Sequence, residues 1–252
     1  MVDTEARIIE NTKIVPDYFL LKLKPVKDFG KVRPGQFVML KIPGNEVFLR
    51  RPFSIYDYDR GILTVMYKVA GKGTEILSKT GKDTLTSVLG PLGNGFRVGK
   101  RDAYLTIAGG IGIAGIHLLI KELKGKASVF FGCSSNIETA LLEDIAHLNP
   151  MVSTLDGSCG YKGNVVEMLK NHLETIENID QEIFVCGPEG MLKSLKTSID
   201  RNKISCQALV EERMACGLGL CFGCVKKTID ENEPYKRVCK EGPVFDLWEI
   251  SL

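Results

Sequence analysis

The sequence has no excess of charge of either sign, since 33 Lys and Arg residues stand against 31 Asp and Glu residues. A net charge of +2 produces no field that attracts nucleic acid or an anionic membrane. The N-terminus lacks the apolar core and small-residue cleavage site of a secretory signal, which predicts a cytoplasmic location. The long uncharged run at residues 103–120 contains four glycines, a Thr and a His. This composition favours a buried strand followed by a helix over a membrane span.

Eight cysteines are present, although no export signal accompanies them. The cytosol keeps thiols reduced, so a disulfide framework is not expected and metal or redox use is the better interpretation. Four of the cysteines are scattered, and the other four lie close together near the C-terminus.

The hydrophobic pattern changes once along the chain. Up to about Phe96, short β-type runs alternate with turns that contain Pro and Gly, which predicts an antiparallel barrel or sandwich. From about Tyr104, strands, Gly-rich turns and helices alternate, which predicts an open parallel α/β sheet. The turn-rich stretch at residues 90–96 is the expected seam. The predicted fold class is α+β multidomain, with an antiparallel β-barrel domain at 1–97, a parallel α/β domain at 98–210 and a small C-terminal loop segment at 211–252.

The clustered cysteines have the spacing C-x4-C-x2-C-x14-C, which is that of plant-type 2Fe-2S ferredoxins. Glycines between them allow backbone amides to approach the sulfur atoms. A zinc site more often has two C-x2-C pairs, and only one such pair is present. The predicted iron ligands are Cys216, Cys221, Cys224 and Cys239.

A second motif combines R-P-F-S with Y-K-V and G-K-G-T further along the predicted barrel. Arginine can bind a pyrophosphate, a hydroxyl can hydrogen-bond a flavin nitrogen, and a Gly-rich turn before a short helix can offer amides to phosphate. Each piece alone occurs by chance or is an ordinary turn.

Two further motifs follow predicted strands of the α/β region. A-G-G-I-G-I-A-G formally contains G-x-G-x-x-G, a turn that can bind a dinucleotide pyrophosphate. The acidic residue expected after the next strand to bind a ribose is absent from residues 132–136, and no arginine is there to bind a 2'-phosphate, which favours NAD over NADP. The strand that ends in C-G-P places Cys186 at the same edge of the sheet, although most free cysteines are simply buried. The three histidines fall in helical patterns and are expected to be surface or packing residues.

In this order the motifs make the chain resemble the ferredoxin-NADP reductase superfamily, over essentially its whole length. Within it, E-R-M-A-C-G-L-G-L-C-F-G-C with V-C-K-E-G-P-V-F resembles the electron-transfer subunits of class 1B, NAD-dependent dihydroorotate dehydrogenases. One departure is Gly115, where many members of the superfamily have proline. The resemblance implies FAD contacts at Arg51, Pro52, Phe53, Ser54, Tyr67, Lys68, Val69, Gly73 and Thr74. It implies that Gly109, Gly110, Gly112, Gly187 and Pro188, with Cys186 as the catalytic residue, bracket the nicotinamide nucleotide.

The resemblance also implies a function in pyrimidine biosynthesis. Electrons would pass from the FMN of a catalytic subunit through a 2Fe-2S cluster and FAD to NAD⁺, in a heterotetramer with two copies of each chain. Flavin is needed because a cluster exchanges single electrons and NAD exchanges a hydride. An alternative is a subunit of another NAD(P)H oxidoreductase, such as NADH-dependent ferredoxin:NADP oxidoreductase or the gamma subunit of a sulfhydrogenase. An alternative of another class is a redox-sensing binding module.

Overall fold

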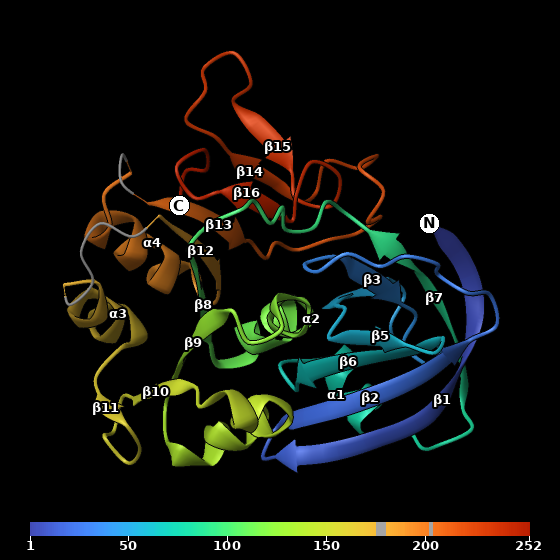
Figure 1. The fold of residues 1–252 in the computed structure, drawn as a ribbon. Helices are drawn as coiled ribbons and strands as arrows, with labels where there is room; N and C mark the ends of the chain where they lie inside the picture. The colour runs from blue at the N-terminus through green and yellow to red at the C-terminus, as the bar shows by residue number, and fades with distance from the viewer. Residues whose placement is uncertain (175–179, 202–203) are drawn as a thin grey trace.

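The computed structural model describes residues 1–174, 180–201 and 204–252, and its two large sheets form separate halves of the molecule (Figure 1). The gaps lie inside the range 98–210 predicted for the nucleotide-binding domain. The domain boundaries at residues 97 and 210 remain a prediction.

The first sheet is antiparallel and contains seven strands in the order β4-β3-β7-β1-β2-β6-β5. Apolar and polar residues alternate along its longer strands, so that one face is buried in the barrel core. The expected antiparallel barrel is confirmed, but part of the predicted seam at 90–96 belongs to β7. The strands are β1 (Val2–Val15), β2 (Tyr18–Pro25), β3 (Phe37–Leu40), β4 (Arg51–Ser54), β5 (Asp57–Asp59), β6 (Ile62–Lys68) and β7 (Leu85–Leu92).

The second sheet has the order β11-β10-β9-β8-β12-β13-β16, and all its strands are parallel except β16. Its central strands are buried on both faces, as their continuous apolar runs predict. The strands are β8 (Ala103–Gly109), β9 (Ala127–Cys133), β10 (Met151–Thr154), β11 (Tyr161–Lys162), β12 (Gln181–Cys186), β13 (Ser205–Leu209) and β16 (Val244–Asp246).

Helices cover both faces of this sheet. α2 and η2 share a core with barrel residues, and α3 and α4 share a core with the C-terminal segment. The helix expected after β9 is present, but it consists of 3₁₀ turns. The helices are α1 (Lys72–Ser78), η1 (Gly110–Gly112), α2 (Ile113–Leu123), η2 (Asn136–Leu148), α3 (Val165–Leu173) and α4 (Glu189–Ser198). Among the described residues, no helix is long and apolar enough to cross a membrane.

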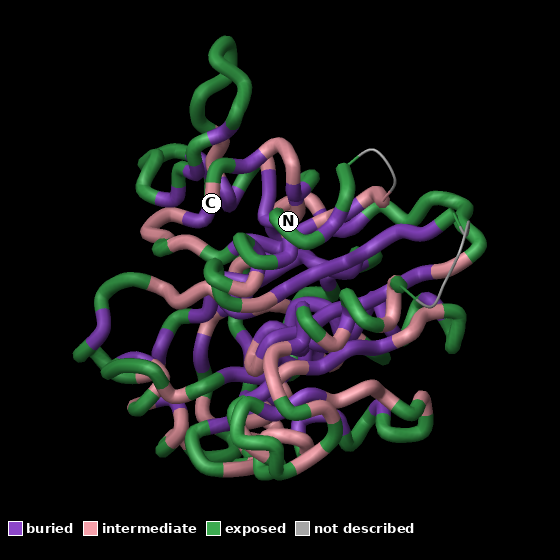
Figure 2. The backbone as a smooth tube through the Cα atoms, turned by 90° about the vertical axis from the view of Figure 1, so that its left-hand side faces the viewer, coloured by how far each residue is buried: buried purple, intermediate pink, exposed green. Residues whose placement is uncertain are grey.

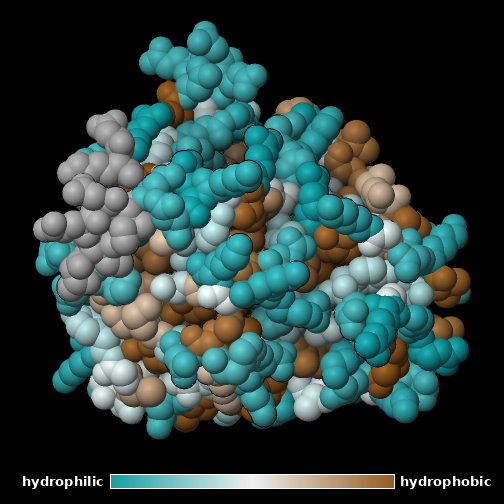
Figure 3. Space-filling view, in the orientation of Figure 1, coloured by the Kyte–Doolittle hydropathy of each residue, from teal (hydrophilic) through white to brown (hydrophobic). Residues whose placement is uncertain are grey.

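The C-terminal segment lies across one end of both halves (Figure 1). Its first part has neither helix nor strand, as the sequence predicts, and it continues as a hairpin of β14 (Val225–Lys227) and β15 (Tyr235–Arg237). The loop of this hairpin projects from the body, is exposed (Figure 2) and carries a hydrophilic tip (Figure 3). The chain then adds β16 to the edge of the nucleotide sheet, where Phe245 and Leu247 are buried. The apolar C-terminus therefore packs against the body as expected.

Candidate functional site

The first cavity, of about 340 Å³, opens between the barrel and the nucleotide sheet. Pro52, Phe53 and Ser54 of β4 line it, together with Tyr67 and Lys68 of β6. These strands lie near one another because the barrel curls, and the ring of Phe53 stands edge-on to that of Tyr67 at 5.8 Å between centroids. The cavity thus combines apolar walls with a hydroxyl and a cation, a lining suited to the ring system of a flavin.

Arg51 and the turn before α1 are not among the residues that line this cavity, but they adjoin its lining residues Pro52 and Ala70. An added Cβ at Gly73 would lie 3.2 Å from Arg51 Nε, so glycine lets the guanidinium pack against the turn. The amides of Ala70 and Gly71 both donate to Thr74 Oγ1, at 2.9 and 3.2 Å. These two amides are therefore engaged within the turn, and contact of the remaining amides with a phosphate stays a prediction. Arg51 is the cation that the structure offers to a pyrophosphate there.

Tyr67 and Val69 differ in how they relate to the cavity. Burial raises the pKa of Tyr67 to about 12, and its hydroxyl donates to Asn11 Oδ1 at 3.0 Å, so this phenol stays neutral and fixed. Val69 is not among the residues that line the cavity, whereas Ala70 is. The backbone amide of Val69 donates to Asp17 at 2.7 Å, which holds the end of β6.

A second cavity, of about 500 Å³, lies at the carboxyl ends of the parallel strands. The lining includes the predicted nucleotide residues Gly109, Gly110, Gly112, Gly187 and Pro188. An added Cβ at Gly112 would lie 2.2 Å from the carbonyl oxygen of Cys186, so only glycine allows the two turns to meet. The position, beyond the carboxyl ends of β8 and β12, is where open α/β sheets bind nucleotides.

The two cavities adjoin, because Lys68, Ile111 and Glu211 line both of them. Gly115 of α2 lies at the same junction. A Cβ at this position would stand 3.1 Å from Cys186 Sγ and 3.5 Å from Ser54 Oγ, and 2.9 Å from the side chain of Leu209. The glycine that replaces the usual proline thus brings residues from both halves of the molecule together.

Cys186 is buried at this junction and does not itself line the second cavity. Burial raises the pKa of its thiol well above the ordinary value, and the charge of nearby Glu211 acts in the same direction. The thiol is therefore neutral at physiological pH, so it can take part through its position but not as a thiolate.

Glu211 is a site residue that the sequence did not single out. Burial raises the pKa of its carboxyl, and no hydrogen bond or ion pair to this carboxyl occurs within the described ranges. A buried acid with a raised pKa that lines two cavities is a candidate functional residue. Its only sequence signal was its place just after the last predicted strand.

Glu138 is the second acid that sequence reasoning missed. It lines the nucleotide cavity, and its carboxylate accepts hydrogen bonds from Tyr18 Oη at 2.6 Å and from the Ser134 amide at 2.7 Å. Burial acts to raise the pKa of Glu138, but these hydrogen bonds and the charge of Lys68 lower it overall. An ionised acid therefore does follow β9, but it lies two residues beyond the range 132–136 in which the sequence lacks one.

The four clustered cysteines converge as two pairs. The thiols of Cys216 and Cys221 interact with each other, and so do those of Cys224 and Cys239. The first pair lies toward solvent, with Cys221 exposed, and the second pair is buried. Two thiolates on each of two irons is the ligand arrangement of a 2Fe-2S cluster.

Backbone amides point at all four sulfur atoms. Burial acts to raise the pKa of Cys216, but amides that include Leu218 lower it to about 6. Burial and the Cys224 thiol raise the pKa of Cys239 to about 12. The backbone amide in each case donates to a cysteine Sγ, and the N–Sγ distances are 3.3 Å from Leu218 to Cys216, 3.4 Å from Gly223 to Cys221, 3.1 Å from Gly219 to Cys239 and 3.4 Å from Cys239 to Cys224.

These contacts fit a cluster with bridging sulfides better than a single ion. Within the described part of the chain, no three His, Cys, Asp or Glu side chains are grouped as the ligands of one metal ion. A 2Fe-2S cluster needs only two protein ligands for each iron, which the paired cysteines supply.

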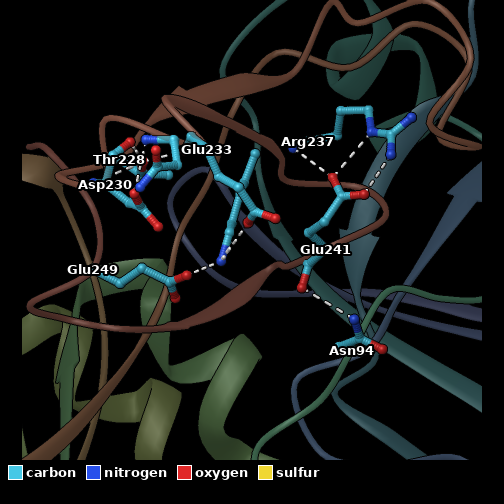
Figure 4. Close-up of polar contacts among 9 residues, drawn as sticks. Asn94, Thr228, Asp230, Glu233, Arg237, Glu241 and Glu249 are labelled. Atoms are coloured by element: carbon cyan, nitrogen blue, oxygen red, sulfur yellow. Dashed lines mark hydrogen bonds and ion pairs between the residues drawn. The ribbon is translucent and has the colours of Figure 1, made fainter.

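The loop at residues 216–224, which carries three of the clustered cysteines and is called the cysteine loop below, lies against the first cavity, the flavin-side cavity. Glu212, Met214 and Pro243 line that cavity, and Met214 is two residues before Cys216. An added Cβ at Gly217 would lie 2.6 Å from Met39 of β3, so the loop packs directly on the barrel. Asn94 of the barrel also donates to the carbonyl oxygens of Lys240 and Glu241, and Arg237 pairs with Glu241 (Figure 4).

Comparisons with known proteins agree along the whole chain. Residues 211–251 match the family model described as the iron-sulfur cluster binding domain of dihydroorotate dehydrogenase B. The electron transfer subunit of dihydroorotate dehydrogenase B (NAD⁺) from Listeria welshimeri is 38% identical, with all of both chains covered. The subunit of the same name from Caldanaerobacter subterraneus is 36% identical over 98% of this chain and 97% of its own.

Solved structures show the same fold. A chain from the structure of an NADH-dependent reduced ferredoxin-NADP oxidoreductase has a TM-score of 0.84 and 25% identity, over 97% of this chain and 89% of its own. A ferredoxin NADP⁺ reductase from Neisseria gonorrhoeae with bound FAD and NADP has a TM-score of 0.67 and 17% identity, over 82% of this chain and 98% of its own.

Proposed function

The chain belongs to the electron-transfer subunits of NAD⁺-dependent dihydroorotate dehydrogenase B, and we propose that its two cavities and its cysteine loop form one electron path. It is an oxidoreductase subunit that uses FAD, a 2Fe-2S cluster and NAD. It passes electrons from the FMN of a catalytic subunit through the cluster and FAD to NAD⁺, a step of pyrimidine biosynthesis. The full-length identity to this family favours it over the other reductase subunits of the superfamily.

The adjoining cavities are the observation that carries this proposal. Lys68, Ile111 and Glu211 line both, so a flavin ring in one would meet a nicotinamide in the other. FAD converts between the single electrons of a cluster and the hydride of NAD. Ser54 and Cys186 would flank the meeting point, where Gly115 allows close packing. Glu211 lies at this meeting point too, and burial raises the pKa of its carboxyl.

The charged residues fit the phosphates and the ribose. Arg51 would hold the FAD pyrophosphate beside Gly73 and Thr74, while the glycine turns at the ends of β8 and β12 would receive the pyrophosphate of NAD. Glu138, ionised at neutral pH, would accept a hydrogen bond from a ribose hydroxyl and repel a 2'-phosphate. This arrangement supports NAD over NADP.

The partner is a catalytic subunit, as the family name implies. We propose that this FMN-containing subunit docks over the cysteine loop, where Leu220 and Phe222 flank Cys221 and are 76% and 60% exposed. Large exposed apolar side chains beside a redox centre are suited to an interface. A heterotetramer of two copies of each chain and a cytoplasmic location belong to the same proposal.

Replacing Cys221 with Ser tests the path, because it removes one ligand of the solvent-side pair. We expect NADH-to-dye activity to stay largely intact while electron transfer with the catalytic subunit is abolished, as measured by dihydroorotate-dependent NAD⁺ reduction. Loss of both activities together would show that the cluster also supports the fold. A purified chain that oxidised dihydroorotate alone at full rate would contradict the proposed division of labour.

A further inference from the structure

Lys226 is a buried cation in the strand that follows the cluster cysteines. Its side chain is only 10% exposed, and its ammonium group contacts Glu189 Oε2 at 2.9 Å and Glu212 Oε1 at 3.1 Å. The next residue, Lys227, is exposed and forms no ion pair among the described residues. The two adjacent lysines therefore differ sharply in surroundings.

The two carboxylates belong to different elements, and only Glu212 is among the residues that line a cavity. Glu189 begins α4, directly after the C-G-P turn of the nucleotide cavity, and Glu212 lines the flavin-side cavity next to Glu211. Lys226 itself lies two residues after Cys224, on β14. One ammonium group thus joins the cysteine loop, the flavin cavity and the nucleotide turn.

These contacts differ from an ordinary surface ion pair because the cation is buried, although Glu189 and Glu212 are 49% and 30% exposed. Lys226 Nζ donates hydrogen bonds to both carboxylates, so two of its N–H groups are engaged by partners from different elements. Hydrogen bonds donated by Lys193 and Lys226 lower the pKa of Glu189 to about 2. Among the described residues, the other ion pairs of β14, β15 and the following turn are internal to the C-terminal segment, such as Arg237 with Glu241.

Burying the ammonium group costs free energy that its contacts with the carboxylates offset, so the contribution of these ion pairs lies more in fixing one arrangement than in net stability. We propose that Lys226 is a positioning residue that holds the cysteine loop at a fixed place against the flavin and nucleotide cavities. This inference rests on the proposed electron path, since its consequence is a fixed separation of cluster and flavin. It predicts that electron transfer between these two centres depends on Lys226, while hydride transfer between NADH and flavin does not.

The test compares four variants of the full chain loaded with FAD and cluster. Lys226→Met keeps the length of the stem and removes the charge, Lys226→Arg can still contact both carboxylates, and Glu189→Gln cuts the contact to α4 while the cation stays. Lys227→Met is the matched control. Stopped-flow absorbance after mixing with NADH follows flavin reduction and cluster reduction separately.

Cluster reduction should slow by about tenfold or more in Lys226→Met, as expected for a reacting group displaced from its place, and by a smaller factor in Glu189→Gln. It should stay within about twofold of the wild type in Lys226→Arg and Lys227→Met, and flavin reduction should stay within about twofold in all four. Removing a cation also lowers the potential of a nearby cluster. Slower cluster reduction in Glu189→Gln, which keeps the cation, would show that the position of the cysteine loop, and not only the charge of Lys226, sets the rate.

A second readout is independent of electron transfer. Amide hydrogen exchange in β14 and β15 should become faster in Lys226→Met and stay unchanged in Lys227→Met. Unchanged exchange together with unchanged cluster reduction in Lys226→Met would overturn the proposal, and so would equal slowing of flavin and cluster reduction. If NADH reduced the flavin but not the cluster in the wild type, the proposed electron path would be wrong, and the exchange data alone would then decide whether Lys226 anchors the loop.

Discussion

Replacing Glu138 with Gln should relax the preference for NAD over NADP. The carboxylate is fixed by Tyr18 Oη at 2.6 Å and by the Ser134 amide at 2.7 Å, and both hydrogen bonds and the charge of Lys68 keep it ionised. A 2'-phosphate in the same part of the cavity would face this negative charge. Glutamine has nearly the same shape, so the change removes mainly the charge.

The size of the effect follows from the distance and the dielectric. Two unit charges about 4 Å apart interact by about 4 kcal/mol at the effective dielectric of a protein surface. Because Glu138 is only half-buried, solvent and salt reduce the repulsion between its carboxylate and a 2'-phosphate. We expect the substitution to remove about 1–3 kcal/mol of repulsion, which corresponds to roughly a 5- to 150-fold change in the ratio of kcat/KM for NADH to kcat/KM for NADPH.

The assay is dye reduction with each nucleotide at low and high salt, with Glu143→Gln as the control. Glu143 is an exposed acid on the same helix, η2, and lies outside both cavities. The altered ratio should come mainly from KM for NADPH, and it should shrink as salt rises. An unchanged ratio in Glu138→Gln, or an equal change in Glu143→Gln, would refute the assignment of the ribose site.

Three other predictions concern the junction of the cavities and the docking surface. Glu211→Gln should stabilise the chain at neutral pH. A carboxyl whose pKa is raised on folding lowers the free energy of unfolding as pH rises above the unfolded pKa of 4.5, and glutamine removes this loss. The gain in Tm should therefore vanish below that pH. Gly115→Ala should lower Tm by about 2–4 °C, since overpacking against Cys186 and Leu209 outweighs the helix propensity of alanine by about 1 kcal/mol; an unchanged Tm would contradict the close packing. Leu220→Asp should weaken binding of the catalytic subunit by about tenfold or more in titration calorimetry, whereas Val26→Asp, at a 75% exposed barrel residue, should not; equal effects would argue against the docking surface.

The sequence predicts those parts of the molecule whose causes are local. Alternating apolar residues mark the long barrel strands, and continuous apolar runs mark the central strands of the nucleotide sheet. Cysteine spacing predicts a shared site because a loop that short can hardly separate three thiols. The segment 90–96 is not predicted correctly by local pattern alone, because its Gly and Pro residues indicate a turn. Pairing with β1 and β3 instead keeps its first residues in β7.

Other site residues depend on contacts between distant parts of the chain. Glu138 reaches the nucleotide cavity because η2 folds back toward Ser134 and because Tyr18 of the barrel lies opposite. Glu211 gains its raised pKa only from burial between the two halves. Lys226 and Lys227 look alike in sequence, and only the packing of β14 makes one of them a buried ion-pair partner.

The pairing of β16 with β13 joins the iron-binding segment to the edge of the nucleotide sheet. The cysteine loop and the last strand belong to one stretch of chain, and Cys224 and Cys239 share a hydrophobic core with the sheet. Without iron, four thiols must share this small space, and metal binding in such segments is coupled to folding. Iron supply would thereby control how firmly the edge of the sheet is closed.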